Sequence, residues 1–230
     1  MTRRILFFDI DGTLIDHARE MRPSVPEAVR RLREAGHLVY LCTGRARVEI
    51  PDDVMALGVD GVISTGGGFV EHRGELLFAH TMSDDVVREL EGIFERVGVE
   101  YVLQGVEAYP SAGLLRTACA FFGHASPPDA EFEEYFGYRG PAPANSIAKA
   151  TFMHTGSGAV EAIREAAGDR FYVIPGSVPI TGGSSGEVGL TGVTKGAAIA
   201  ELVEWLGMSL ADAVGIGDSD NDLEMLELVG

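Results

Sequence analysis

Two short acidic stretches hold the residues whose types and spacing could do chemistry. Asp9 and Asp11 stand two positions apart in "DIDGT", and Asp218, Asp220 and Asp222 fall within five positions in "GDSDND". Carboxylates crowded in this way repel one another unless a cation lies near them. Mg²⁺ prefers carboxylate and backbone oxygens, so these stretches predict a magnesium site, with a solvated turn as the alternative for each.

The N-terminal pair also suits covalent catalysis. Asp9 and Asp11 follow the apolar run "ILFF", and their spacing lets both side chains project to the same side of the chain. With a metal bound, one carboxylate could act as the nucleophile while the other transfers protons. Asp218 or Asp222 could complete the ligand shell of a metal held by Asp9 and Asp11.

Other residues beside apolar runs suit the binding of a phosphate group. Thr43 offers a hydroxyl, Gly44 a backbone N–H, and Gly12 a backbone that a bound group can approach closely. Lys195 opens a predicted helix, where its charge and the helix dipole favour an anion, and Asn221 could donate its amide. Taken singly, the threonine is more often a helix cap and the lysine a surface residue. Together with the carboxylates, they form the apparatus of phosphoryl transfer.

The elements that must position these residues are typical of an open α/β sheet. Buried strands are expected at "RRILFFD", "LVYLC", "GVIS" and "DAVGIGD", and helices at "SVPEAVRRLREAGH" and "TKGAAIAELVEWLG". Ser24 and Glu27 have the spacing of a capping box, and Trp205 is expected in the core. The carboxyl ends of parallel strands meet at one edge of a sheet, where ligands bind. We therefore expect the polar clusters to converge at this edge.

The middle of the chain predicts a second unit inserted into the first. "GFVEHRGELLFAH" has the pattern of a hairpin that turns at Arg73–Gly74, and short strands and helices alternate after it. Residues 123–146 are rich in Gly, Pro, Ala and acids, and their pattern places no element there. "TGGSSGEVGLTG" is interpreted as a hinge or return loop. The predicted division is a core over 1–81 and 187–230 with an α+β cap over 82–186.

Composition limits the possible partners and location. Lys and Arg total 18 against 35 for Asp and Glu, which gives a formal charge of -17. Such a field repels nucleic acid and anionic membranes. The two cysteines are too few for a disulfide framework, and neither a signal peptide nor a membrane-spanning run is seen. A cytoplasmic protein is expected, monomeric or homodimeric, whose partner is a small phosphorylated metabolite.

Four motifs occur in a family's characteristic order. "FFDIDGTL", "LCTGR", "GVTKG" and "GIGDSDNDLEML" resemble the signature motifs of the haloacid dehalogenase superfamily of phosphohydrolases, over essentially the whole chain. The insert resembles the larger α+β cap of the Cof-type sugar-phosphatase branch, and "ISTGGGFVE" sits where that branch commonly has an "NGA"-like turn. The resemblance implies a Rossmann-like parallel-sheet core with an inserted cap.

The resemblance also implies catalytic roles. Asp9 would be the nucleophile that forms an aspartyl-phosphate, and Asp11 would protonate the leaving group and then activate water. Asp218 would bind Mg²⁺ together with Asp9 and the backbone carbonyl of Asp11.

The phosphate-binding roles follow in the same way. Thr43 and Lys195 would bind the phosphoryl group, and Asn221 and Asp222 would support the phosphate, the metal or Lys195. The function expected is a Mg²⁺-dependent phosphatase of a small phosphorylated metabolite, with a sugar phosphate favoured. A phosphomutase and a catalytically silent metabolite-binding module are the alternatives.

Two expectations concern the end of the chain and the substrate. Relatives normally continue past the equivalent of Gly230 with another strand and helix, so the C-terminal part of the core is expected to be truncated. Arg45, Arg47, Arg116 and His124 are candidates for approaching the substrate, and nothing in their spacing selects among them.

Overall fold

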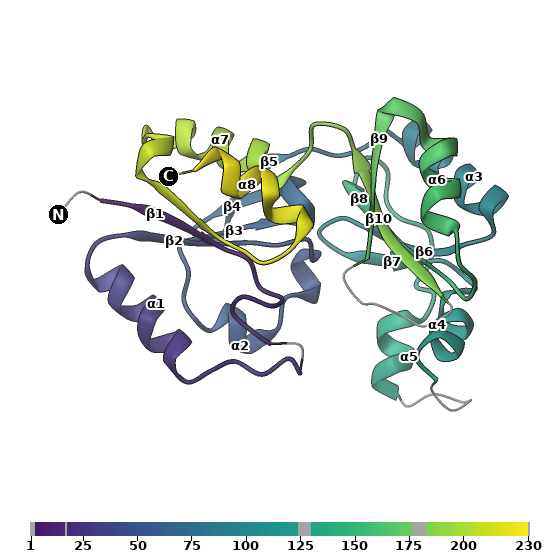
Figure 1. Cartoon of the computed structure of the whole chain (residues 1–230), viewed down its shortest axis with the longest axis horizontal. Coiled ribbons are helices and arrows are strands. Elements are labelled where there is room, and N and C mark those ends of the chain that lie inside the picture. Colours follow the sequence, from purple (N-terminus) through teal and green to yellow (C-terminus); the bar gives the residue numbers. More distant parts are fainter. Residues whose placement is uncertain (1–2, 17, 124–129, 177–182, 230) are drawn as a thin grey trace. The chain divides into compact units, whose positions relative to one another are not determined.

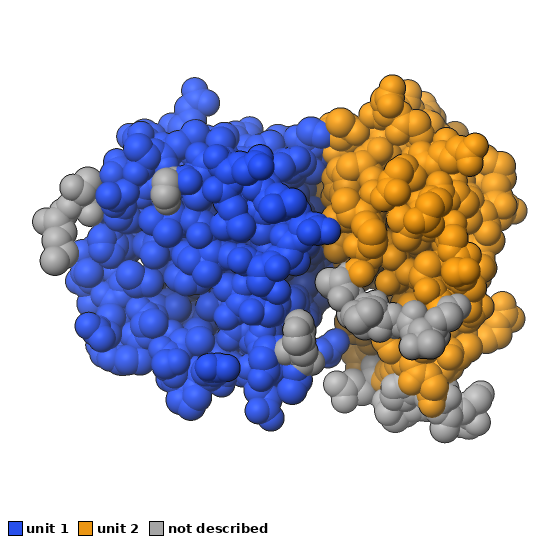
Figure 2. Space-filling view, in the orientation of Figure 1, with its two compact units in different colours: residues 1–80, 192–230 blue, residues 81–191 orange. Residues whose placement is uncertain are grey.

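The chain folds into two compact units. The computed structural model describes residues 3–16, 18–123, 130–176 and 183–229. One unit comprises residues 1–80 and 192–230, and the other comprises residues 81–191 (Figure 2). Since the first unit is built from both ends of the chain, the second is inserted into it. Among the described residues, no helix is both long enough and apolar enough to span a membrane.

A mixed sheet forms the centre of the first unit. Its strand order is β11-β1-β2-β3-β4-β5 (Figure 1). The strands span Ile5–Phe8 (β1), Leu38–Cys42 (β2), Gly61–Ser64 (β3), Phe69–His72 (β4), Glu75–Ala79 (β5) and Ala213–Ile216 (β11). β11, β1, β2 and β3 are parallel, whereas β4 and β5 are antiparallel. The hairpin turn at Arg73–Gly74 is confirmed: both residues have positive φ, 52° and 84°, as a tight two-residue turn requires.

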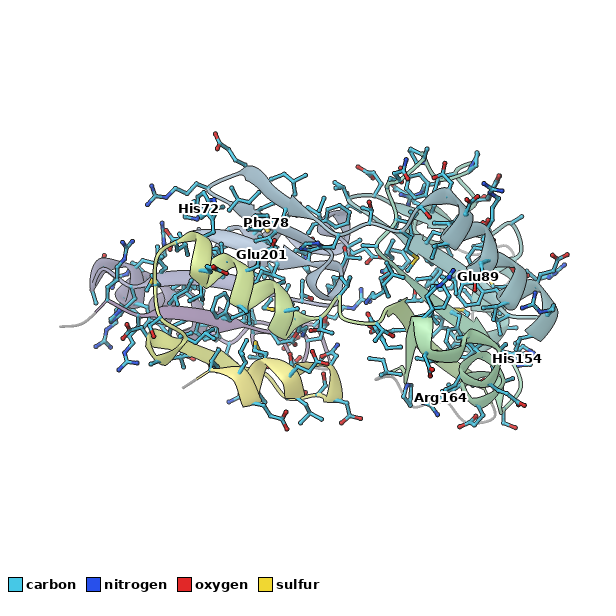
Figure 3. The ribbon with its side chains drawn as sticks, turned by 90° about the horizontal axis from the view of Figure 1, so that it is seen from above. His72, Phe78, Glu89, His154, Arg164 and Glu201 are labelled. Carbon is cyan, nitrogen blue, oxygen red and sulfur yellow. The ribbon has the colours of Figure 1, made fainter. Side chains whose placement is uncertain are left out.

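Helices cover both faces of this sheet, which explains why its parallel strands are apolar throughout. Helices α1 and α2 lie on one face and α7 and α8 on the other (Figure 1). They span Ser24–Glu34 (α1), Asp52–Met55 (α2), Lys195–Trp205 (α7) and Leu223–Leu228 (α8). Leu41 and Val62 are buried on the α2 side, and Phe7 and Ile63 on the α7 side. Phe78 of β5 packs on the α7 side of the sheet (Figure 3). Glu201 of α7 contacts the ring of His80 at 2.7 Å.

An antiparallel sheet forms the inserted unit, in the order β7-β6-β8-β10-β9. Its strands span Glu100–Gln104 (β6), Ala108–Pro110 (β7), Lys149–His154 (β8), Phe171–Pro175 (β9) and Ser184–Leu190 (β10). Its helices span Asp84–Val97 (α3), Leu114–Phe122 (α4), Ala130–Phe136 (α5) and Ala159–Ala167 (α6). Phe94 of α3 and Ile163 of α6 are buried against the sheet, and Leu114 of α4 packs with Met153 of β8. Helix α5 lies within residues 123–146, where the sequence pattern placed no element.

The interpretation of residues 181–192 as a hinge or return loop is wrong, because residues 184–190 form strand β10 between β8 and β9. This strand was not predicted because it contains glycines, which are typical of loops. An added Cβ at Gly186 would lie 2.5 Å from the ring of Phe152, and one at Gly189 would lie 2.5 Å from the ring of Tyr172. The glycines therefore make room for aromatic neighbours. The chain returns to the first unit at Gly192 rather than at residue 187, and residues 177–182 lie outside the described part.

Two local expectations fail as well. Trp205 is 51% exposed rather than buried, because it is the last residue of α7 and meets the ring of His72 edge-on. The capping box is absent because α1 begins at Ser24 itself, and Glu27 pairs with Arg30 at 2.7 Å instead.

Candidate active site

The predicted polar clusters meet at the carboxyl edge of the parallel strands. Asp9 follows β1, and its N–H donates to the Ile216 carbonyl at 2.8 Å. Thr43 follows β2, and its N–H donates to the Ile63 carbonyl at 2.9 Å. These bonds continue the sheet beyond the strand ends, so they fix the point from which each side chain projects. Asp218 lies just beyond β11, the strand that pairs with β1.

Lys195 joins the two ends of the chain at this edge. The Thr194 hydroxyl caps α7 at 3.2 Å, so the helix begins at Lys195. The Lys195 Nζ lies 2.6 Å from Asp9 Oδ1, 2.6 Å from Asp222 Oδ1 and 3.2 Å from Asn221 Oδ1. Burial lowers the pKa of this ammonium, but the charges of Asp9 and Asp222 outweigh burial and hold the pKa above its ordinary value. Lys195 is therefore a fixed cation in a buried position.

Asp9 remains under-neutralised despite this cation. Burial raises the pKa of Asp9 from its ordinary 3.8 to about 6, against the opposing pull of Lys195, and the charge of Asp222 raises it further. Two buried carboxylates thus share one ammonium. A further positive charge beside Asp9 would relieve the excess.

Asp222 holds Lys195 and the loop of Asp218 in place through hydrogen bonds. Its side chain is fully buried, and its Oδ1 accepts from Lys195. Its Oδ2 accepts from the backbone N–H groups of Asp218 and Ser219, both at 3.1 Å. Both carboxylate oxygens are already engaged, so this residue orients Lys195 and the loop that carries Asp218.

The acidic groups fit a hard divalent cation. One carboxylate oxygen from each of Asp9, Asp218 and Asp222 lies within 4.8 Å of the others. Asp218 is exposed, and its Oδ1 accepts from the Thr13 hydroxyl at 3.3 Å. Gly12 keeps this space open, because an added Cβ would lie 2.2 Å from Asp218 Oδ2 and its φ of +82° disfavours other residues. Hard oxygen donors, net negative charge and access to water are what Mg²⁺ requires.

Asp11 has a different partner from Asp9. Arg45 Nε donates to Asp11 Oδ2 and Arg45 Nη2 donates to Asp11 Oδ1, both at 2.7 Å. Burial raises the pKa of Asp11, but these bonds and the charge of Arg45 outweigh burial, so the pKa lies below its ordinary value. The two carboxylates therefore have separate cations, although they stand two residues apart.

From the sequence, Arg45 was one of four residues equally suited to approach the substrate. Its position after Thr43 and Gly44 was the available signal. Of the others, Arg47 pairs with Glu71 at 3.4 Å. Arg116 lies on α4 of the inserted unit, and His124 is outside the described residues.

Apart from Lys195, which opens α7, the predicted phosphate-binding residues lie in the segments that follow β1, β2 and β11. The Thr43 hydroxyl is buried and accepts from the Arg45 N–H at 3.1 Å, and Gly44 lies between these two residues. The Asn221 carbonyl oxygen accepts from Lys195 and, at 2.8 Å, from the Ser219 hydroxyl. The amide nitrogen of Asn221 is thus the end that can donate to a ligand.

Comparison with known proteins identifies the family. The family model described as haloacid dehalogenase-like hydrolase matches residues 6–230. The chain belongs to this family. It is 29% identical over 239 residues to the HMP-PP phosphatase of Shigella flexneri serotype 5b, which covers 99% of this chain and 82% of that protein. Relatives of the same name from Escherichia coli strains are similar to the same degree.

Solved structures agree on the fold. A hypothetical protein from Geobacillus kaustophilus HTA426 matches with a TM-score of 0.75 and 29% identity, covering 100% of this chain and 85% of that one. The subclass IIB sugar phosphatase BT4131 matches with a TM-score of 0.72 and 20% identity, over 98% and 85% of the two chains. The predicted superfamily and the α/β fold class are confirmed, and the chain is a hydrolase of this family.

Proposed function

We propose that this hydrolase is a Mg²⁺-dependent phosphatase that cleaves a small phosphorylated metabolite through an aspartyl-phosphate on Asp9. The observation that carries the proposal is the buried contact of Asp9 with Lys195 at 2.6 Å, beside the carboxylates of Asp218 and Asp222. A nucleophilic carboxylate needs a fixed orientation and positive charge that attracts the phosphoryl group. Both are present at this edge of the sheet.

Three groups would hold the metal: the carboxylates of Asp9 and Asp218 and the backbone carbonyl of Asp11. When bound, Mg²⁺ supplies positive charge that neutralises Asp9 and the phosphoryl oxygens. Asp222 contributes through Lys195 and the Asp218 loop, because its own oxygens are engaged. Lys195, the Thr43 hydroxyl and the Asn221 amide bind the phosphoryl oxygens.

The reaction proceeds in two steps on the chain's own carboxylates. An oxygen of Asp9 attacks phosphorus, the bond from phosphorus to the substrate oxygen breaks, and Asp11 gives that oxygen a proton. Water then attacks the phosphorus of the aspartyl-phosphate while Asp11 takes a proton from it. Phosphate leaves, Asp9 is regenerated, and Asp11 carries the proton taken from water, which replaces the one given to the leaving oxygen.

The substrate is a small phosphorylated metabolite. Relatives at 29% identity are named HMP-PP phosphatase, which makes HMP-PP the first compound to test. Sugar phosphates, favoured by the sequence resemblance, come next. The cytoplasmic location and the monomeric or homodimeric state stay predictions.

A phosphate-release assay tests the proposal. Purified protein is given HMP-PP and a panel of sugar phosphates, with Mg²⁺ or with EDTA, and Asp9→Asn is compared with Asp220→Asn. Asp220 is exposed in the same acidic loop as Asp218, which makes its variant a matched control. We expect Mg²⁺-dependent release that Asp9→Asn abolishes and Asp220→Asn preserves, with a phosphorylated peptide containing Asp9 in quenched samples.

Other outcomes would point elsewhere. Phosphate release that survives Asp9→Asn contradicts the covalent route. An isomerised product without free phosphate indicates a phosphomutase, and ligand-induced stabilisation without turnover indicates a binding module.

A further inference from the structure

The proposed proton-transfer residue, Asp11, is held in place by one side chain. Among the residues that the structure describes, Arg45 is the only side chain that donates a hydrogen bond to the Asp11 carboxylate. Asp11 is 52% exposed, so without this contact its carboxylate could rotate toward solvent. Asp9, by contrast, is buried and held by Lys195.

Arg45 is itself fixed at both ends. Its Nη1 donates to the Glu49 carbonyl at 2.7 Å, which orients the guanidinium plane from the side opposite Asp11. Its backbone N–H donates to the Thr43 hydroxyl, and its carbonyl accepts from the Thr65 N–H at 2.7 Å. The Arg45 side chain is 18% exposed. A planar, two-point contact from so constrained an arginine defines both the place and the plane of the carboxylate.

We propose that Arg45 is a positioning residue, which holds the Asp11 carboxyl group where it can exchange protons with the leaving oxygen and with water. The inference rests on the proposed function. Three of the five guanidinium N–H groups of Arg45 are engaged by Asp11 and by the Glu49 carbonyl, so we expect Arg45 to act mainly through Asp11 rather than by binding the phosphoryl group. If Asp11 takes up a proton, one of its oxygens can still accept from Arg45, so the constraint on position persists.

Two substrates with different leaving groups can show whether Arg45 positions Asp11 or binds the phosphoryl group. Phenyl phosphate releases a basic phenolate that needs a proton, whereas 2,4-dinitrophenyl phosphate releases a phenolate that needs almost none. kcat/KM reports the steps up to formation of the covalent intermediate, so it isolates the first proton transfer. A misplaced proton donor should lower kcat/KM for the first substrate alone, whereas a lost phosphate contact should lower it for both.

The variants are Arg45→Met, Arg45→Lys and the control Arg47→Met. We expect Arg45→Met to lower kcat/KM for phenyl phosphate about 10²-fold and for 2,4-dinitrophenyl phosphate less than about 5-fold. Arg45→Lys keeps the charge but cannot make the two-point contact, so it should show the same selectivity with a smaller loss. Arg47 stands two residues away and pairs with Glu71, so its variant should retain activity on both substrates.

A double variant provides the second arm of the test. In an Asp11→Asn background, Arg45→Met should change kcat/KM for 2,4-dinitrophenyl phosphate by less than about 2-fold, because there is no proton-transfer group left to position. Equal losses on both substrates, or a full loss in that background, would overturn the inference while leaving the proposed phosphatase intact. If Arg45→Met does not fold, the test uses Arg45→Lys and compares its losses of kcat/KM on the two substrates. If wild-type protein shows no Asp9-dependent hydrolysis, the proposed function fails and this inference fails with it.

Discussion

Replacing the nucleophile should make the metal-free protein more stable. Asp9, Asp222 and Lys195 are buried together, so the cluster carries one uncompensated negative charge. Asp9→Asn removes that charge, keeps an oxygen that can accept from Lys195, and leaves a balanced pair of Lys195 and Asp222. The residue proposed to do the chemistry is therefore expected to lower the stability of the fold when no metal is bound.

The size of the effect follows from the pKa. The pKa of Asp9 is about 6 in the folded protein against an ordinary 3.8, so the folded state binds its proton more tightly than the unfolded state does. Stability is therefore lost as the pH rises between these two values and Asp9 ionises. Above the folded pKa, ionisation of Asp9 lowers the free energy of unfolding by about 3 kcal/mol. At pH 4 this loss should be less than about 1 kcal/mol.

The assay is thermal unfolding in EDTA followed by Trp205 fluorescence. This residue is the chain's one tryptophan and lies in the same unit as Asp9, so its signal reports that unit. At pH 8 the unfolding temperature of Asp9→Asn should exceed that of wild type by roughly 6–12 °C, and the difference should shrink toward pH 4. Asp220→Asn, which removes an exposed carboxylate, should match wild type throughout.

Mg²⁺ supplies an internal check. Mg²⁺ should raise the unfolding temperature of wild type, because it binds the folded state through Asp9. The gap between the unfolding temperatures of Asp9→Asn and wild type should therefore narrow, because the variant has lost a metal ligand. A pH-independent difference, or an Asp9→Asn protein less stable than wild type at pH 8, would refute the view that Asp9 is under-neutralised.

Three further substitutions test neighbouring features. Gly12→Ala places a methyl group in the space of the Asp218 carboxylate, so the Mg²⁺ concentration for half-maximal stabilisation should rise roughly 10- to 100-fold in a thermal titration. Lys195→Met leaves two buried carboxylates without an ammonium and should cost about 3–5 kcal/mol in urea unfolding at pH 8; a loss below 1 kcal/mol would contradict this burial argument. Thr65 is β-branched with φ of 55°, so Thr65→Asn should stabilise by about 1 kcal/mol in the same assay, and no gain would mean that its backbone is not strained.

Much of the core and its acidic edge follows from the sequence, because both depend on local pattern. Apolar runs that end in Asp9, Thr43 and the Asp218 loop predict parallel strands, and the topology of such sheets brings the strand ends together. The contact of Lys195 with Asp9 joins residues 186 positions apart and depends on where α7 packs on the sheet. What the residue types could not give was the pairing of Asp11, since an arginine two residues past a threonine has no pattern that names its partner.

The misses have physical causes in tertiary packing. Strand β10 is rich in glycine because aromatic rings of neighbouring strands occupy the space where side chains would stand. The sequence of that strand therefore has the composition of a loop. Asp222 shows the complementary case, because its full burial and its contacts with backbone N–H groups depend on how the loop folds over it.

The pairing of β1 with β11 also constrains the order in which the protein can fold. Ile5 lies opposite Ala213, so β11 can pair with β1 only after residues 213–216 have left the ribosome. Until then, β1 has an open edge and Asp9 lacks its lysine. Domains generally fold as units during synthesis, so we expect the inserted unit to fold first, which shortens the loop that the two halves of the first unit must close. Folding of the insert thus brings the two halves of the first unit closer together before β11 completes the catalytic edge.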